Sequence, residues 1–148
     1  MTTRRALACT LYCLLAAALL AGCRNEGAAP PQVLAPIEAG NGRLDWAGMQ
    51  PCADCEGIET HLSLVNEGGR RSFVLTETYL AERPVRFVEN GKWQREGDLL
   101  LLTGKDEARL GYVVLEDGRL QPRDVRGRRL PGSDGDGLLL PIAASVDR

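Results

Sequence analysis

The side chains best suited to bind a metal ion or to carry redox chemistry are concentrated in one short stretch of the sequence. Cys52 and Cys55 form a Cys-x-x-Cys motif, Met49 lies three residues before it, and His61 lies six residues after it. Thiolate and thioether sulfur are soft ligands that favour Cu(I), and two or three of them are enough to bind it. The stretch therefore predicts a reactive loop whose chemistry depends on the oxidation state of the two cysteines.

Four kinds of chemistry fit this motif. In an exported chain the simplest outcome is a local disulfide between Cys52 and Cys55 that fixes the shape of the loop. A Cu(I) site would use Met49 and both cysteines, with His61 available as a fourth ligand. Thiol–disulfide catalysis normally places the motif at a helix N-terminus, whereas this one leads into a predicted strand. Structural zinc would need a second pair of ligands, which a second chain would have to supply.

The N-terminal residues predict export and attachment to a membrane by lipid. Two arginines precede an apolar run at residues 6–20, which has the length of a secretory signal and is short for a transmembrane span. The sequence Leu-Ala-Gly-Cys follows at residues 20–23, and it resembles the lipobox of bacterial lipoproteins. We therefore expect residues 1–22 to be a signal peptide, cleaved after Gly22, and Cys23 to be the lipidated first residue of the mature chain.

Composition narrows the functional classes. The 148 residues include 18 basic and 20 acidic side chains, and two of the basic ones leave with the signal. The remaining 126 residues are enough for one domain with a core and are mildly acidic. An exported, acidic chain without a basic tract is not expected to bind nucleic acid. With Cys23 assigned to lipid, and Cys9 and Cys13 removed with the signal, Cys52 and Cys55 are the thiols that remain.

Residues 23–41, which begin with the lipidated cysteine and end before the first predicted strand, predict a flexible tether. They are rich in Ala, Pro, Gly and Glu and have no usable periodicity. Fully extended, residues 24–41 span at most about 60 Å, so the folded part can stand clear of the bilayer. A strand at residues 33–37 is the alternative, and Pro36 argues against it. Residues 42–148 are expected to form one folded domain.

From residue 42 onward the pattern favours β-strands. Residues 58–64 alternate apolar and polar side chains, and residues 73–79 continue this pattern after a Gly-Gly turn. The pair Asn90-Gly91, between two strand-like segments, predicts a tight hairpin turn. Further strands are expected in four segments, at residues 99–103, 111–115, from 120 and at 138–142. About seven short strands separated by glycine-containing turns predict an all-β antiparallel meander that closes into a barrel or a sandwich.

One segment resembles a known family. The residues from Pro51 to Ile58 (Pro-Cys-Ala-Asp-Cys-Glu-Gly-Ile), with Thr60, Leu62 and Leu64 after them, closely resemble the hallmark of the NlpE-like copper resistance lipoproteins. Tyr79, the 87–93 segment and Tyr112 also resemble that family's N-terminal domain, and the similarity spans roughly residues 42–142.

The resemblance implies a small, partly open, lipocalin-like β-barrel and attachment to the outer membrane. It also implies roles in copper tolerance and in sensing envelope stress or surface contact, and it carries over Cys52 and Cys55 as the functional pair. This sequence ends after the first domain, without the second, OB-like domain and cysteine pair of the longer members. Any signalling to a membrane kinase that depends on two domains is therefore in doubt for this chain.

These observations together predict a non-enzymatic lipoprotein that faces the periplasm and binds Cu(I) or an envelope protein through the Cys52–Cys55 loop. Arg24 stands where an inner-membrane retention signal would have aspartate, which favours the outer membrane. No catalytic residue is assigned, because the acidic residues of the loop have no evident histidine or serine partner. Two alternatives are a carrier of small apolar ligands, which requires a deep cavity in the barrel, and a thiol–disulfide redox protein.

Overall fold

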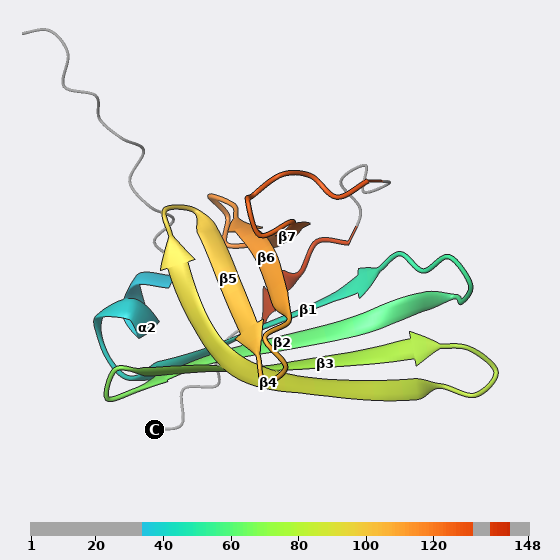
Figure 1. The fold of residues 1–148 in the computed structure, drawn as a ribbon, viewed down its shortest axis with the longest axis horizontal. Helices are drawn as coiled ribbons and strands as arrows, with labels where there is room; N and C mark the ends of the chain where they lie inside the picture. The colour runs from blue at the N-terminus through green and yellow to red at the C-terminus, as the bar shows by residue number, and fades with distance from the viewer. Residues whose placement is uncertain (1–33, 132–136, 143–148) are drawn as a thin grey trace, which may run out of the picture.

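The computed structural model describes residues 34–131 and 137–142, which form one antiparallel sheet curled into a partly open barrel (Figure 1). A short helix, α2 (Ala35–Ala39), is followed by eight strands: β1 (Gly42–Gln50), β2 (Gly57–Glu67), β3 (Arg70–Leu80), β4 (Val85–Glu96), β5 (Leu99–Gly104), β6 (Arg109–Val114), β7 (Leu120–Arg123) and β8 (Leu140–Ile142). Their order in the sheet is β7-β6-β5-β4-β3-β2-β1-β8. The predicted all-β antiparallel meander is confirmed.

The two ends of the sheet are joined by a short bridge. Leu120 at the start of β7 and Leu139 just before β8 exchange two backbone hydrogen bonds of 2.9 Å. Side chains point alternately into the barrel and out of it along each strand, and the inward ones fill the interior of the barrel. The main buried ones are Trp46, Leu62, Leu64, Phe73, Leu75, Trp93, Leu100, Leu102, Tyr112 and Val114. Within the described residues no helix is long and apolar enough to span a bilayer.

The segment predicted as a tether contributes to the folded domain. Leu34 and Ile37 are 0% and 1% exposed and pack on the core at one end of the barrel. Asn66 donates a hydrogen bond of 2.6 Å to the Ile37 carbonyl, and Arg95 forms an ion pair of 3.0 Å with Glu38. Pro36 argued against a strand here, and it is compatible with the first turn of the helix that forms instead. The folded part therefore includes residues 34–41, and the boundary expected at residue 42 is corrected.

Replacement of Ile37 by alanine is expected to lower the free energy of unfolding by about 2–4 kcal/mol, because it removes buried methyl and methylene groups from the end of the barrel that α2 covers. Chemical denaturation of the full chain would measure the loss. The exposed neighbour Ala39 supplies a control, and Ala39→Ser should change the stability by less than about 0.5 kcal/mol. Equal stabilities of the two variants would show that α2 does not hold the barrel.

The predicted hairpin turn at Asn90-Gly91 is wrong. β4 runs without interruption through both residues, and Gly91 pairs with Phe73 on one side and Gly104 on the other. A Cβ atom on Gly91 would lie 2.9 Å from Phe73 Cε1 and 2.9 Å from Gly104 Cα. Glycine is needed here because the neighbouring backbone comes too close for a side chain. In the sequence, an Asn-Gly pair that serves this purpose looks the same as an Asn-Gly pair that forms a turn.

β4 pairs with β3 up to Lys92 and with β5 from Gly91 onward, and this shift from one neighbour to the other opens the barrel. Residues 85–90 pair with β3, whereas the pairing with β5 begins at Gly91. The ends of β2, β3 and β4 at residues 57–60, 76–80 and 85–90 therefore extend beyond β5 and β6 as an arm (Figure 1). On the inner face of this arm the rings of Tyr79 and Phe87 meet edge to face, with centroids 5.4 Å apart.

Candidate functional site

The Cys-x-x-Cys motif lies in the loop between β1 and β2, at the tip of the arm (Figure 1). Cys52 and Cys55 are both half-buried and are joined by a disulfide, with their Cα atoms 5.4 Å apart. The backbone N–H of Glu56 donates to the Leu80 carbonyl at 2.9 Å, and the amide of Gln50 donates to the Gly137 carbonyl at 2.6 Å. The loop is therefore tied to β3 and to the segment before β8, and the disulfide fixes its shape.

Removal of the disulfide is expected to cost little stability. A loop of four residues closed by a disulfide contributes about 2 kcal/mol in the chain-entropy model, so Cys52→Ser/Cys55→Ser should lower the free energy of unfolding by about that amount or less. Chemical denaturation of the parent, the double variant and the reduced parent would test this expectation. The reduced parent should match the variant, and a reductant should not change the variant further. Unfolding of the double variant in water would show instead that the barrel depends on this bond.

Met49 and His61 lie on the outer face of the sheet, near the loop but outside it. The Met49 side chain is 51% exposed, and its sulfur lies 2.7 Å from where a Cβ atom on Gly57 would be, so it packs over the foot of the loop. His61 pairs with Ala47, two residues before Met49, and its Nε2 is 3.6 Å from a carboxylate oxygen of Glu59. Cys23 lies outside the described residues.

The structure shows the predicted copper ligands with their two cysteines oxidised. The disulfide removes both thiolates, which leaves the Met49 thioether and the His61 imidazole on the outer face. Among the described residues, no three His, Cys, Asp or Glu side chains are grouped in a way that could hold a metal ion. Reduction of the disulfide is therefore a precondition for copper binding by this set of residues.

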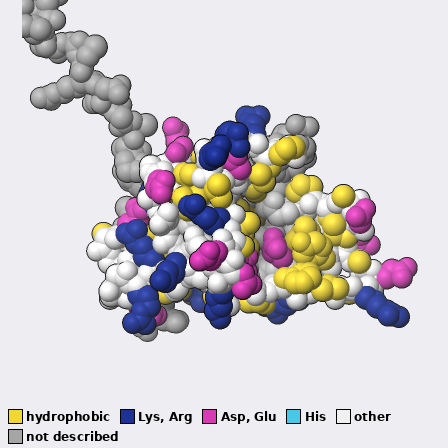
Figure 2. Space-filling model, in the orientation of Figure 1, with side chains coloured by type: hydrophobic (Ala, Val, Ile, Leu, Met, Phe, Trp, Pro, Cys, Tyr) yellow, Lys and Arg dark blue, Asp and Glu magenta, His cyan; other side chains and the backbone are white. Residues whose placement is uncertain are grey.

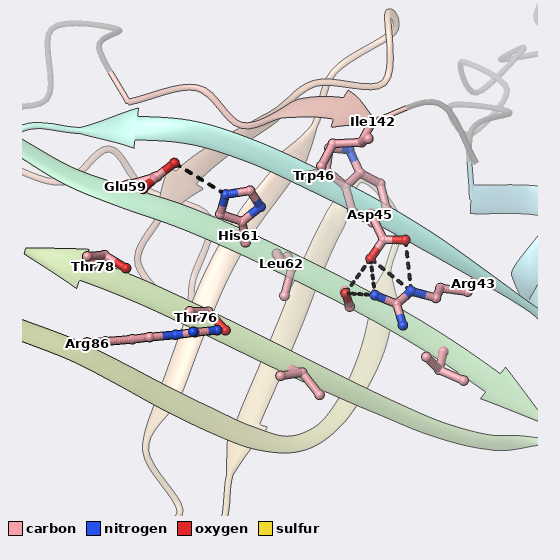
Figure 3. A pocket seen from close by; sticks show the side chains of 13 residues that line it. Arg43, Asp45, Trp46, Glu59, His61, Leu62, Thr76, Thr78, Arg86 and Ile142 are labelled. Carbon is pink, nitrogen blue, oxygen red and sulfur yellow. Dashed lines mark hydrogen bonds and ion pairs between the residues drawn. The ribbon is translucent and has the colours of Figure 1, made fainter. Parts of the chain in front are cut away.

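A shallow groove of about 900 Å³ runs along the outer face of β1 to β4 (Figure 3). At one end Arg43 donates to Asp45 and to Ser63, each at 2.8 Å, and the Ser63 hydroxyl donates to Asp45. Burial of Asp45 opposes ionisation, but the hydrogen bonds from Arg43 and Ser63 outweigh it and hold the pKa of that carboxyl below its usual range. The hydrogen-bonding groups of these three side chains are therefore paired with one another and do not require a ligand.

Two carboxylates lie at the open mouth of the barrel, where the arm leaves β5 and β6. Glu77 of β3 and Glu89 of β4 line a groove of about 400 Å³, and Glu77 also lines a second one of about 310 Å³ beside Tyr112. Burial, and then the negative charge of Glu89, raises the pKa of Glu77. Burial and the same two carboxylates also raise the pKa of the Tyr112 hydroxyl. The mouth is therefore an acidic, partly desolvated site.

This acidic pair was not predicted as a site, although the sequence carries a signal for one of its members. Glu77 occupies an inward position of β3, in step with Phe73, Leu75 and Tyr79. A charged residue in a series of apolar inward positions indicates either an open end of the barrel or a functional group. Glu89 carried no such signal, because the turn predicted at Asn90-Gly91 placed it at the last residue of its strand segment, where a charged side chain is ordinary.

The raised pKa of Glu77 predicts that this residue lowers stability at neutral pH. Since its pKa is higher in the folded than in the unfolded chain, its favourable contribution is complete at low pH and is lost as pH rises through the folded-state pKa. Glu77→Gln should therefore raise the melting temperature at pH 7 and have little effect near pH 4, with thermal unfolding followed by circular dichroism between these values. Glu82→Gln, in the exposed β3–β4 loop, is the control. A Glu77→Gln effect that did not depend on pH would contradict the assignment.

Comparison with known proteins gives consistent matches. A family model described as the NlpE N-terminal domain matches residues 46–133. Lipoprotein NlpE of Escherichia coli (strain K12) is 42% identical over 89 residues, which are 57% of this chain and 36% of the relative. The chain thus matches little more than a third of the length of that curated relative.

Two solved structures are also similar. The crystal structure of the Cpx pathway activator NlpE from Escherichia coli is 37% identical, with a TM-score of 0.49, and the match covers 59% of this chain and 45% of that one. A lipoprotein structure from Shewanella oneidensis is 30% identical, with a TM-score of 0.48, and the match covers 64% of this chain and 83% of that one.

Proposed function

The chain belongs to the NlpE family of envelope lipoproteins, and we propose that it acts in the envelope by binding a protein partner and reporting the state of the envelope to it. One relative is named as an activator of the Cpx pathway. The observation that carries the proposal is the arm, which holds the disulfide loop, the acidic mouth and exposed apolar side chains at one end of the barrel. The proposed role is therefore one of binding.

The N-terminal sequence supports attachment to the outer membrane. The cysteine of the lipobox, Cys23, would carry the lipid, and Arg24 would not retain the protein in the inner membrane. The domain would then face the periplasm, with α2 near the attachment point and the arm at the opposite end of β1 (Figure 1). A partner in the periplasm would thus meet the arm first.

A reporter assay tests the proposal. The full chain would be expressed in an Escherichia coli strain that lacks its own NlpE and carries a Cpx-dependent reporter. We expect reporter output to rise with the parent chain, and to rise less or not at all with a Glu77→Gln/Glu89→Gln variant present at the same level in the membrane fraction. Absence of any rise with correctly localised parent protein would overturn the proposed role.

We also propose copper tolerance as a second role that depends on reduction of the disulfide. Met49 packs at the foot of the loop, so reduction would place two thiolates beside an exposed thioether. The test is an anaerobic Cu(I) titration of the reduced full chain in competition with a chromogenic chelator. Cys52→Ser/Cys55→Ser should lose binding and His61→Ala should retain most of it. Equal copper affinity of the cysteine variant and the parent would exclude these cysteines as ligands.

The two alternative functions receive less support. A carrier requires a deep apolar cavity, whereas large side chains such as Trp46, Leu64 and Leu102 fill the described interior. Its test is displacement of a fluorescent fatty acid.

A redox enzyme requires an activated thiolate, and the motif precedes strand β2 without a helix to stabilise one. Turnover in an insulin-reduction assay would restore that alternative.

A further inference from the structure

Residues 85–90 of β4 form a strand edge that no other part of the described chain covers. β4 pairs with β3 from Val85 to Lys92, but its pairing with β5 begins at Gly91. β5 turns back after Gly104, opposite Gly91, so the place that a longer β5 would occupy beside residues 85–90 is vacant in the described structure. An unpaired edge exposes a row of backbone donors and acceptors that another extended chain can use.

The register of the sheet shows which backbone groups face this free edge. β4 and β5 are joined by a two-residue turn at residues 97–98, and in such a turn the flanking residues, Glu96 and Leu99, form a hydrogen-bonded pair. Hydrogen-bonded pairs recur at every second residue of an antiparallel ladder, so the even-numbered residues of β4 bond towards the β5 side. The even-numbered residues of β4 therefore direct their backbone groups away from β3. On this count Arg86, Val88 and Asn90 present their N–H and C=O groups to the free edge.

A groove of about 400 Å³ lies along the same edge. It is bounded by β3 and β4 on one side and by Lys105 and Asp106, in the turn after β5, on the other. The groove thus occupies the space between the free edge and the turn where β5 ends. Its position and direction suit an extended segment that continues the sheet where β5 leaves off.

The side chains around the edge are those of a binding surface. Val85, Phe87 and Val88 are 50%, 56% and 55% exposed, so both faces of the edge strand are apolar and accessible. Figure 2 shows hydrophobic side chains gathered on the part of the molecule where Figure 1 places the arm, with acidic side chains beside them. Natural strand edges that avoid pairing usually carry several charged side chains, proline or a bulge. Residues 85–90 contain no proline and only one arginine and one glutamate, which balance each other in charge.

Charge indicates the kind of segment that fits. Glu77, Glu89 and Asp106 outnumber Lys105 around the groove, and Glu77 and Glu89 line it side by side from neighbouring strands. A second copy of this chain, paired edge to edge about a two-fold axis, would bring like acidic mouths together and would be repelled. A basic side chain placed between the two carboxylates would relieve their repulsion.

We propose that the free edge of β4 at residues 85–90 binds an extended segment of a partner protein as an added β-strand, with a basic side chain of that segment held between Glu77 and Glu89. The inference rests on the proposed function, because it specifies how the partner is bound. Backbone pairing supplies the general affinity, and the apolar faces and the acidic mouth select a segment that alternates apolar and basic residues.

A peptide-binding assay on the full chain tests the edge. The probe is a fluorescent, end-capped octapeptide of alternating valine and lysine, measured by fluorescence anisotropy. We expect saturable binding, at least about tenfold weaker binding of the matching valine–glutamate peptide, and no binding of a valine–lysine peptide methylated at all of its backbone nitrogens, because such a peptide has no N–H donor left on either edge. Equal binding of the methylated and unmethylated peptides to the parent would overturn the proposal without any variant having to fold.

A pair of substitutions at one position tests the site itself. Val88→Pro removes an edge N–H while leaving the groups that pair with β3, and Val88→Thr keeps that N–H in a side chain of similar shape. Peptide affinity should fall at least about tenfold in V88P and stay within about twofold of the parent in V88T. Equal affinities would overturn the proposal. So would a parent dimer that V88P converts to a monomer, because the edge would then belong to a second copy.

The two proposals fail in distinguishable ways. A chain that binds the peptide with the expected variant pattern but never raises the Cpx reporter would overturn the proposed function and leave the edge assignment standing. A chain that raises the reporter equally in its V88P and V88T forms would overturn the edge assignment and leave the proposed function standing.

Discussion

Replacement of Gly91 by valine is expected to destabilise the barrel by about 3 kcal/mol or more. Any Cβ atom at this position meets the Thr103 carbonyl, Phe73 and the backbone of Gly104, and none of these can withdraw without shifting β5 or the core. The expected result is a marked loss of the free energy of unfolding in chemical denaturation. The slope of the transition should be unchanged if the barrel still unfolds as one unit.

A substitution at Asn90 distinguishes close backbone approach at Gly91 from an Asn-Gly turn. Asn90→Val should be nearly neutral, because valine suits a strand and no close contact is created. In an Asn-Gly turn, by contrast, Asn90 would also need a positive φ, and valine there would be strongly unfavourable. Comparable losses in Asn90→Val and Gly91→Val would contradict a continuous β4.

Cys23→Ser is expected to abolish lipid attachment altogether. The thiol of Cys23 is the group that would accept the lipid, and serine cannot form the thioether. In fractionation of cells expressing the full chain, protein cleaved by another peptidase should leave the membrane pellet, whereas protein with an uncleaved signal should stay there through the apolar run at residues 6–20. Metabolic labelling with a radioactive fatty acid should lose all signal in the variant.

The control for this prediction is Cys13→Ser, within the apolar run of the signal. It should be lipidated and pelleted like the parent, since cleavage after Gly22 would remove Cys13 with the signal. Lipid label retained in Cys23→Ser, or lost in Cys13→Ser, would show that the lipobox has been assigned to the wrong cysteine.

The sequence was most informative where the structure depends on local periodicity. Residues 58–64 alternate in type because one side of β2 faces the core, and the structure buries Thr60, Leu62 and Leu64 as that alternation requires. The Cys-x-x-Cys motif likewise identified the loop, because two cysteines three residues apart can be joined within one loop.

The parts that could not be predicted depend on contacts between distant residues. The signature Asn-Gly is the same whether glycine permits a turn or admits a neighbouring backbone, and only Phe73 and Thr103 decide which applies. Leu34 and Ile37 were assigned to a tether because their burial depends on contacts with β1 and β2, such as the hydrogen bond from Asn66 to the Ile37 carbonyl. The sequence signals Glu77 as an inward charge, but its position beside Glu89 could not be inferred, because the two meet only where β4 separates from β5.

If Cys23 carries the lipid as proposed, packing of Leu34 and Ile37 on the barrel also limits how far the folded domain can reach from the membrane. The chain from Cys23 to Leu34 spans at most about 37 Å when fully extended, compared with about 60 Å for a tether that ends at residue 41. β1 then carries the Cys52–Cys55 loop about 30 Å further from α2. With α2 included, the loop would therefore reach no further than roughly 75 Å from the attachment point, and a partner that remains beyond that distance would be out of contact.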